Sequence, residues 1–220
     1  MVYNVNEIMD LVSELGLYDG INFSEDECDE FVGQIKRDDF SYNTGISKLV
    51  LKPEGKDYVI KIPFSTFYEE EDGEYYSFSC YGDRKWNACE YEEELYNLAR
   101  GYDFEKFFLP VEFVGVVNDY PIYIQAKADI IYEERDKYQK YHSSIDTKKI
   151  LKEKHIGLMS RLVENWFDAV RMLCEEDEFI GFLNFLQVNN MIEDLHEANV
   201  GFYKGMPVIV DYAGFNREEE

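Results

Sequence analysis

Residues 46–62 have the pattern of a β-hairpin, and no other segment limits the possible folds as strongly. Two apolar runs, 46–51 and 58–62, flank a Pro-Glu-Gly-Lys-Asp segment at 53–57. Runs of this length, rich in Val and Ile and separated by a Pro- and Gly-containing turn, are typical of two antiparallel strands. The pattern therefore predicts an antiparallel hairpin with Lys61 on its returning strand.

Helical and strand patterns follow one another along the rest of the chain. Apolar residues at every third or fourth position indicate helices, whereas short apolar runs beside Gly, Asn or Asp indicate strands. Ser24 followed by Glu27 is the pattern of a capping box at a helix start. Residues 65–86, which are aromatic and acidic, predict a long hairpin or a surface insertion. Helices are predicted over 5–17, from Ser24, over 87–100, and over about 155–174 and 178–190, and strands over 107–117, 121–128 and around a Lys204-Gly205 turn.

The composition indicates a folded protein. Apolar residues make up 45% of the 220 residues and aromatic residues 16%, which is too many for a disordered chain even with 31% charged residues. No apolar run approaches the roughly 20 residues that a membrane-spanning helix needs, and the start of the chain is polar and acidic. We therefore expect a cytoplasmic protein with no membrane partner. The four scattered cysteines suggest neither a zinc site nor a disulfide framework.

The net charge of −24 restricts the possible partners. A small soluble domain typically needs only about 2 to 8 units of charge to remain soluble. The phosphates of a nucleic acid would be repelled by this excess, so direct nucleic-acid binding is not expected. A basic protein, in contrast, would be attracted toward such a surface.

Polar residues suited to phosphoryl transfer lie near the end of the sequence. The segment D-L-H-x-x-N places Asp194 and Asn199 five residues apart, and D-Y-A-G places Asp211 at the end of the following strand. Phosphoryl transfer requires oxygen ligands for Mg²⁺ and an acceptor for the proton of the attacking hydroxyl. The pattern therefore predicts a hydroxyl acceptor and two metal ligands in this segment.

These motifs resemble the catalytic and metal-binding loops of protein kinases, and the D-L-H-x-x-N form resembles those of aminoglycoside and choline-type small-molecule kinases. The resemblance implies that Asp194 is the catalytic residue, that Asn199 and Asp211 bind Mg²⁺, and that the nucleotide is ATP. Val59-Ile60-Lys61 resembles the third-strand lysine motif of the same superfamily, so Lys61 is expected to hold the phosphates.

Two further features follow from the resemblance. The helix from residue 87 is expected to supply the carboxylate that orients Lys61, with Glu90 and Glu94 as the predicted residues and Glu93 an open alternative. Segment 43–48 would correspond to the glycine-rich phosphate loop. It holds a single glycine, so Ser47 or Lys48 is expected to take over the contact with the phosphates.

The resemblance implies an α+β, two-lobed protein-kinase-like fold in a single domain. N-terminal helices are expected over 1–40, a small antiparallel-sheet N-lobe with its helix over 41–128, and a reduced helical C-lobe over 129–220. The chain departs from the superfamily pattern at Ile192, which stands where a His usually precedes the catalytic Asp. It also ends nine residues after Asp211, so we expect no activation segment and no peptide-substrate platform.

Two functions are compatible with these features. The first is an ATP- and Mg²⁺-dependent phosphotransferase of minimal kinase-like fold, whose substrate the sequence does not specify. The second is a catalytically inactive kinase-like protein, a pseudokinase, that binds or inhibits a basic, nucleic-acid-binding protein through its acidic surface. Because a pure scaffold has no physical need for all of Lys61, Asp194, Asn199 and Asp211, the first function is favoured.

Overall fold

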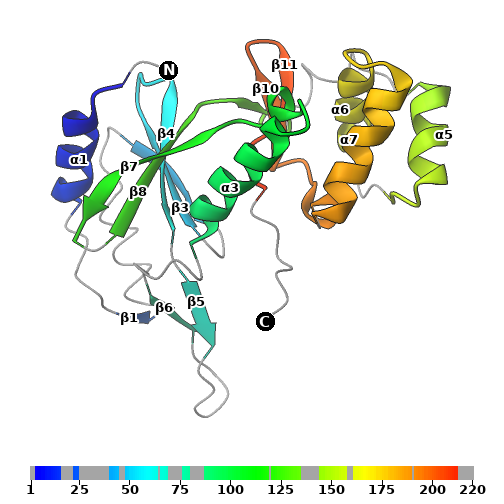
Figure 1. Cartoon of the computed structure of the whole chain (residues 1–220). Helices are drawn as coiled ribbons and strands as arrows, with labels where there is room; N and C mark the ends of the chain where they lie inside the picture. Colours follow the sequence, from blue (N-terminus) through cyan, green and yellow to red (C-terminus); the bar gives the residue numbers. More distant parts are fainter. Residues whose placement is uncertain are drawn as a thin grey trace. The chain divides into compact units, whose positions relative to one another are not determined.

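The computed structural model is a mixed α+β protein with antiparallel sheets, which confirms the predicted fold class at this level (Figure 1). The chain divides into two compact units, each formed from two segments. The structure describes residues 3–15, 22–24, 40–44, 48–63, 65–68, 76–79, 87–118, 120–134, 144–157, 161–189 and 191–212. The first unit comprises Met1–Glu94 and Pro110–Lys127, and the second comprises Leu95–Leu109 and Ala128–Glu220.

A five-stranded antiparallel sheet forms the centre of the first unit. Its strands are β2 (Phe40–Thr44), β3 (Lys48–Pro53), β4 (Tyr58–Pro63), β7 (Val111–Val117) and β8 (Tyr120–Ala126), in the order β2-β3-β4-β8-β7. The predicted hairpin is β3 and β4. Gly55, in the turn between them, has φ +71°, a left-handed conformation that favours glycine.

Helix α1 (Val5–Glu14) covers one face of this sheet. The Asn4 side chain caps the helix by accepting a hydrogen bond from the Asn6 N–H. Ile8 and Val12 are one turn apart and fully buried, and they belong to the same apolar cluster as the buried sheet residues. The helix predicted over 5–17 is therefore confirmed, although it ends at Glu14.

A second, three-stranded sheet has the order β1-β6-β5, with all pairs antiparallel. Its strands are β1 (Asn22–Ser24), β5 (Ser65–Tyr68) and β6 (Tyr76–Ser79). The pairing of β5 with β6 fits the hairpin predicted within 65–86, of which residues 69–75 and 80–86 lie outside the described part of the chain. Ser24 is the last residue of β1, and the helix predicted to follow it also lies outside the described residues.

Helices dominate the second unit. They are α5 (Ile145–Glu153), α6 (Arg161–Arg171) and α7 (Glu176–Val188), with short 3₁₀ helices η2 (Glu105–Phe107) and η3 (Ile192–Asp194). A small antiparallel sheet of β9 (Asp129–Ile130), β10 (Val200–Tyr203) and β11 (Met206–Ile209) completes the unit, in the order β11-β10-β9. The two packed helices predicted after residue 155 are α6 and α7.

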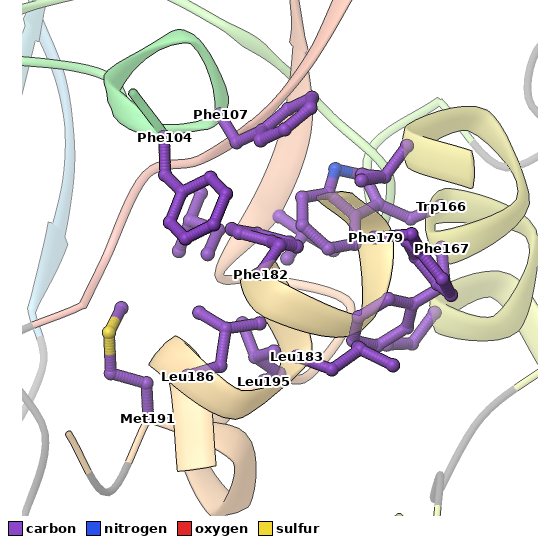
Figure 2. Close-up of a cluster of buried hydrophobic side chains, with 14 of the residues drawn as sticks. Phe104, Phe107, Trp166, Phe167, Phe179, Phe182, Leu183, Leu186, Met191 and Leu195 are labelled. Carbon is purple, nitrogen blue, oxygen red and sulfur yellow. The ribbon is translucent and has the colours of Figure 1, made fainter. Parts of the chain in front are cut away.

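An aromatic core holds the second unit together (Figure 2). The Phe182 ring of α7 lies at its centre, 4.9 Å from the Phe107 ring and 5.6 Å from the Phe104 ring between centroids. Because these rings belong to the second core, segment 95–109 packs with this unit. That differs from the predicted N-lobe, which ran without interruption over 41–128. The strand predicted from residue 107 begins only at Val111 for the same reason.

A buried carboxylate on α6 lacks part of its hydrogen bonding. Asp168 is almost fully buried, and its Oδ1 accepts the Ser144 N–H at the start of α5 at 3.0 Å. Among the buried side-chain oxygens of the described residues, Asp168 Oδ2 and Asn165 Oδ1, one helical turn apart, have no hydrogen-bond partner. Burial raises the pKa of Asp168, although hydrogen bonds from Ser144 and Thr147 oppose the rise.

Replacing Asp168 by Asn is expected to stabilise the protein at neutral pH. The folded state of the wild type binds the Asp168 proton more tightly than the unfolded state, so its free energy of unfolding falls as pH rises through the raised pKa. In Asp168→Asn, the amide oxygen can still accept the Ser144 N–H, and the buried side chain no longer carries a charge. We expect a gain of about 1 kcal/mol at pH 7, or roughly 2–4 °C in Tm.

Thermal melts followed by circular dichroism between pH 4 and pH 8 measure this effect. The gain should shrink toward acidic pH, where the wild-type carboxyl is protonated. Glu134→Gln, which removes the same charge from an exposed position, is the control for the general effect of lowering the net charge. An equal rise in Tm for both variants would contradict the assignment to Asp168.

Candidate functional site

Two lysines share one carboxylate in the first unit. Lys61 Nζ, on β4, lies 2.9 Å from Glu92 Oε2 and 3.1 Å from Glu92 Oε1, and Lys48 Nζ, on β3, lies 2.7 Å from the same Oε1. Lys48 and Lys61 are each 3% exposed, and Glu92 is fully buried. We call this cluster the Lys48–Glu92–Lys61 triad. Buried charges are costly unless they are paired, and each lysine here is paired with Glu92.

The register of the β3–β4 hairpin places the two lysines on one face of the sheet. Val50 is directly opposite Lys61, and Lys48 is two residues before Val50. Lys48 and Lys61 are therefore diagonal neighbours, which lie about 7–8 Å apart in an antiparallel pair and within reach of long side chains. Two like charges in this position repel each other unless an anion lies between them, and Glu92 is that anion.

Asn87 fixes the start of the helix that carries Glu92. Helix α3 spans Ala88–Arg100, and Asn87 Oδ1 accepts the N–H groups of Cys89 and Glu90, each at 3.1 Å. Asn87 Nδ2 also donates to the Tyr123 hydroxyl on β8 at 2.7 Å. The helix start is thus joined to the sheet, and Glu92 lies one turn further on. Burial raises the pKa of Tyr123 strongly, so this hydroxyl stays protonated and neutral.

The partner of Lys61 is Glu92, so the predicted partners, Glu94 and Glu90, are wrong. Glu94 and Glu90 were expected, but Glu94 is exposed and Glu90 is only half-buried, whereas Glu92 is the carboxylate bound to Lys61. Glu92 lies three residues after the buried Cys89 and seven before the buried Ala99, on the apolar stripe of α3. An acidic residue on an apolar stripe is the sequence signal that identifies it.

Ser47 and Lys48 were predicted to contact phosphate, but only Lys48 belongs to the part of the chain that the structure describes. Lys48 is the first residue of β3 and belongs to the triad, so it is buried beside Lys61. Ser47 lies outside the described residues. Of the two residues proposed to contact phosphate, the structure therefore places only Lys48.

Asp194, Asn199 and Asp211 form a second group, in the second unit. Asp194 is the last residue of η3, and Asn199 Nδ2 donates to the Asp194 backbone carbonyl at 2.9 Å. The Asn199 N–H in turn donates to the His196 carbonyl at 3.0 Å. His196 stabilises the same loop by accepting the Ala198 N–H at Nδ1. The loop between Asp194 and Asn199 is thus held by its own hydrogen bonds.

The β10–β11 hairpin brings Asn199 and Asp211 to the same end of the small sheet. The Val210 N–H donates to the Asn199 carbonyl at 2.9 Å and closes the base of the hairpin. At the other end, Lys204 and Gly205 have φ of 52° and 84°, as a tight two-residue turn requires. The predicted hairpin and its Lys-Gly turn are confirmed, and its polar residues flank its base.

Gly201 explains why β10 can lie so close to its neighbour β9. A Cβ atom at this position would lie 2.5 Å from the Asp129 carbonyl oxygen, so the strands could not keep this spacing with any other residue. The Gly201 carbonyl also accepts the indole N–H of Trp166, on α6, at 3.3 Å. The strand next to Asn199 is therefore joined to both the sheet and the helical core.

The donor set of the second group fits Mg²⁺. Because Asn199 Nδ2 donates to Asp194, its Oδ1 is the atom that would bind a cation, together with an Asp211 carboxylate oxygen. Mg²⁺ is typically held by one or two protein oxygens, with substrate phosphates and waters as its other ligands. Within the described residues, no group of three or more His, Cys, Asp or Glu side chains is arranged to hold a metal ion. Asn199 and Asp211 therefore supply oxygen atoms of the kind that Mg²⁺ prefers.

Comparisons with known proteins add no assignment: no protein-family model matches the chain, and a search of curated proteins found no match. Among the described residues, no helix is long and apolar enough to cross a membrane. The chemistry of the two polar groups is therefore the basis for assigning a function.

Proposed function

We propose that this chain is a phosphotransferase of minimal kinase-like fold that uses ATP and Mg²⁺. The observation that carries the proposal is the buried ion pair between Lys61 on β4 and Glu92 on α3, the following helix. In protein kinases a strand lysine must pair with a glutamate of the next helix for the enzyme to be active. A buried pair on these two elements, in a chain that also carries a D-L-H-x-x-N segment, supports the resemblance.

The sheet of the first unit also supports the proposal. Its five antiparallel strands, with α3 between β4 and β7 along the chain, fit the small antiparallel-sheet lobe that the resemblance implies. The helical second unit fits a reduced C-lobe. Fold alone does not establish an activity, so the residues carry the functional part of the proposal.

Each polar residue has a defined role in this proposal. Lys61 binds the nucleotide phosphates and Glu92 orients its ammonium group. Asn199 and Asp211 hold Mg²⁺, which when bound would neutralise charge on the phosphates. Asp194 accepts the proton of the substrate hydroxyl. The hydrogen bond from Asn199 to the Asp194 carbonyl keeps the proton acceptor and the metal ligand in a fixed relation.

A thermal-shift titration with ATP, with and without Mg²⁺, tests the proposal. A ligand that binds only the folded state stabilises it by about 2.7 kcal/mol at 100 times its Kd, or roughly 5–10 °C for a chain of this size. We expect a shift that is larger with Mg²⁺, is lost in Lys61→Met, and loses its Mg²⁺ dependence in Asp211→Asn. Absence of any shift at millimolar ATP would contradict nucleotide binding.

Asp194→Asn separates binding from catalysis. A positioned general base typically contributes about 10²–10⁴-fold to rate, so ATP turnover should fall by at least about 100-fold. The ATP-dependent thermal shift should remain within about twofold of wild type in apparent Kd, because Asp194 does not hold the phosphates. Unchanged turnover in Asp194→Asn would show that the catalytic assignment is wrong.

The net charge of −24 favours one alternative function. In it, the chain is an inactive kinase-like protein that binds or inhibits a basic, nucleic-acid-binding protein through electrostatic attraction. In that case ATP should not raise the Tm of the chain. A basic protein should be captured at low salt, and its affinity should fall steeply as the salt concentration rises.

A further inference from the structure

We propose that Asn87 and Tyr123 are positioning residues that hold Glu92 against Lys61. The hydrogen bond from the Asn87 amide to the Tyr123 hydroxyl controls this ion pair through the position of helix α3. This role deepens the proposed function, and its consequence for ATP turnover rests on that function. The effect on Lys61 itself can be measured without any nucleotide.

Two contacts join α3 to neighbouring positions on two strands of the sheet. Tyr123, on β8, lies directly opposite Lys61, on β4, so the two side chains share one face of the sheet. The Tyr123 hydroxyl accepts a hydrogen bond from Asn87 Nδ2 at 2.7 Å. Lys61 Nζ lies 2.9 Å from Glu92 Oε2. The start of α3 and its Glu92 side chain are therefore held by adjacent residues of one sheet face.

The side chain of Asn87 cannot move independently of the helix start. Its Oδ1 accepts the N–H groups of Cys89 and Glu90, and its backbone carbonyl accepts the Tyr91 N–H at 3.2 Å. These are contacts of the first helical turn, where an Asn side chain satisfies N–H groups that have no partner within the helix. Glu92 follows five residues after Asn87, about 7.5 Å along the helix axis. A displacement of the helix start therefore also displaces Glu92.

In the first unit, apolar packing contributes little to fixing α3 on the sheet. Among the described residues of this unit, the buried apolar cluster between α3 and the sheet consists of Cys89, Val111 and Tyr123. The cluster on the opposite face of the sheet, which holds α1, is far larger. Apolar burial is non-directional, whereas a hydrogen bond restricts both distance and angle. The polar contacts of Asn87 and Glu92 therefore determine where this part of α3 lies.

Loss of the Tyr123 hydroxyl would release the helix start. Asn87 is 5% exposed and Tyr123 is 4% exposed, so the amide has no ready access to water. A buried donor that loses its acceptor carries the full cost of its desolvation. In Tyr123→Phe, the Asn87 amide regains a hydrogen bond with water once the helix start moves away from the sheet. Glu92 then moves with the helix, and its ion pair with Lys61 loosens.

Trace acetylation of the full-length chain, quantified by mass spectrometry, tests this role. The reagent modifies a lysine only when its amino group is accessible, so the buried Lys61 should react slowly in the wild type. In Tyr123→Phe we expect its rate of modification to rise by about tenfold, the effect of losing one hydrogen bond from the closed state. Lys149, an exposed lysine of the second unit, is the internal reference and should keep its rate within about twofold.

Substitutions of Asn87 separate the positioning role from helix capping. Asn87→Ser retains a capping hydroxyl but has no side-chain nitrogen to donate to Tyr123, so Lys61 should become about as reactive as in Tyr123→Phe. Asn87→Asp also caps the helix, and its carboxylate can accept a hydrogen bond from the Tyr123 hydroxyl, so Lys61 should remain protected. Tyr58→Phe removes a hydroxyl from a buried tyrosine on the opposite face of the same sheet. It is the matched control, and Lys61 should react in it as in the wild type.

ATP turnover provides a second readout. Lys61 keeps its charge in Tyr123→Phe but loses its orientation, so kcat should fall by about tenfold or more while KM changes by less than about twofold. Tyr58→Phe should leave both constants unchanged. A general loss of stability would not produce this split at a temperature well below Tm.

The outcomes distinguish this role from the proposed function. An unchanged rate for Lys61 in Tyr123→Phe would overturn the positioning role and leave the phosphotransferase intact. Acetylation of Lys61 that depends on Tyr123, in a chain that shows no ATP turnover, would support the positioning role and overturn the proposed function. Asn87→Ser provides the decisive measurement should Tyr123→Phe fail to fold, and wild-type protection of Lys61 in that variant would also overturn the role.

Discussion

Glu92→Ala is expected to destabilise the protein by about 3–5 kcal/mol, because it leaves the ammonium groups of Lys48 and Lys61 buried without their shared carboxylate. Breaking a buried ion pair costs far more than removing an exposed charge, which usually changes stability by no more than about 0.5 kcal/mol. Urea denaturation at pH 7 gives the difference in the free energy of unfolding.

Glu94→Ala is the matched control for this measurement. It removes the same side chain from the same helix, two residues away, at an exposed position. The double variant Lys48→Met/Glu92→Ala should be less destabilised than Glu92→Ala alone, because one buried charge is then absent. A larger loss of stability for Glu94→Ala than for Glu92→Ala would contradict the assignment of Glu92.

Phe182→Ala is expected to cost about 3–5 kcal/mol, because it opens a cavity at the centre of the second core. The ring is fully buried, and the rings of Phe104, Phe107 and Trp166 lie around it (Figure 2). Its centroid lies 4.9 Å from that of Phe107, 5.6 Å from Phe104, 6.2 Å from Phe108 and 6.4 Å from Trp166.

Urea denaturation of Phe182→Ala and of Val188→Ala compares a buried and an exposed position on α7. Val188 is 81% exposed at the end of the helix, so its truncation should change the free energy of unfolding by less than about 0.5 kcal/mol. A loss below about 1 kcal/mol for Phe182→Ala would show that the core tolerates the cavity, and would contradict the central position of this ring.

The elements predicted from the sequence are those whose pattern lies in residues close together along the chain. The β3–β4 hairpin follows from a Pro- and Gly-containing turn between apolar runs, and α7 from its dense apolar spacing. Helix α5 was missed because its outer face is charged and only Thr147, Ile150 and Leu151 are buried. Strand β9 was missed because two residues show no periodicity, and its position depends on the close approach of Gly201.

In the candidate site, too, local patterns were predicted and contacts between distant segments were not. Asp194 and Asn199 are five residues apart, so a local motif was sufficient to predict that they share one loop, whereas the hydrogen bond between them was not predicted. The partner of Lys61 depends on which face of α3 meets the sheet, and the prediction relied on the spacing of Glu90 and Glu94 rather than on the apolar stripe that carries Glu92. The place of Lys48 in the triad depends on strand register as well, which no local pattern specifies.

The turn of the β10–β11 hairpin offers a place to observe the second polar group without altering it. Lys204 and Gly205 lie at the tip, four residues or more from Asn199 and Asp211 along either strand, whereas the Val210-to-Asn199 hydrogen bond closes the base. A spectroscopic label at residue 204 would therefore keep the base hydrogen bond and both oxygen ligands. Such a label would make this short hairpin a reporter of cation binding that is independent of turnover.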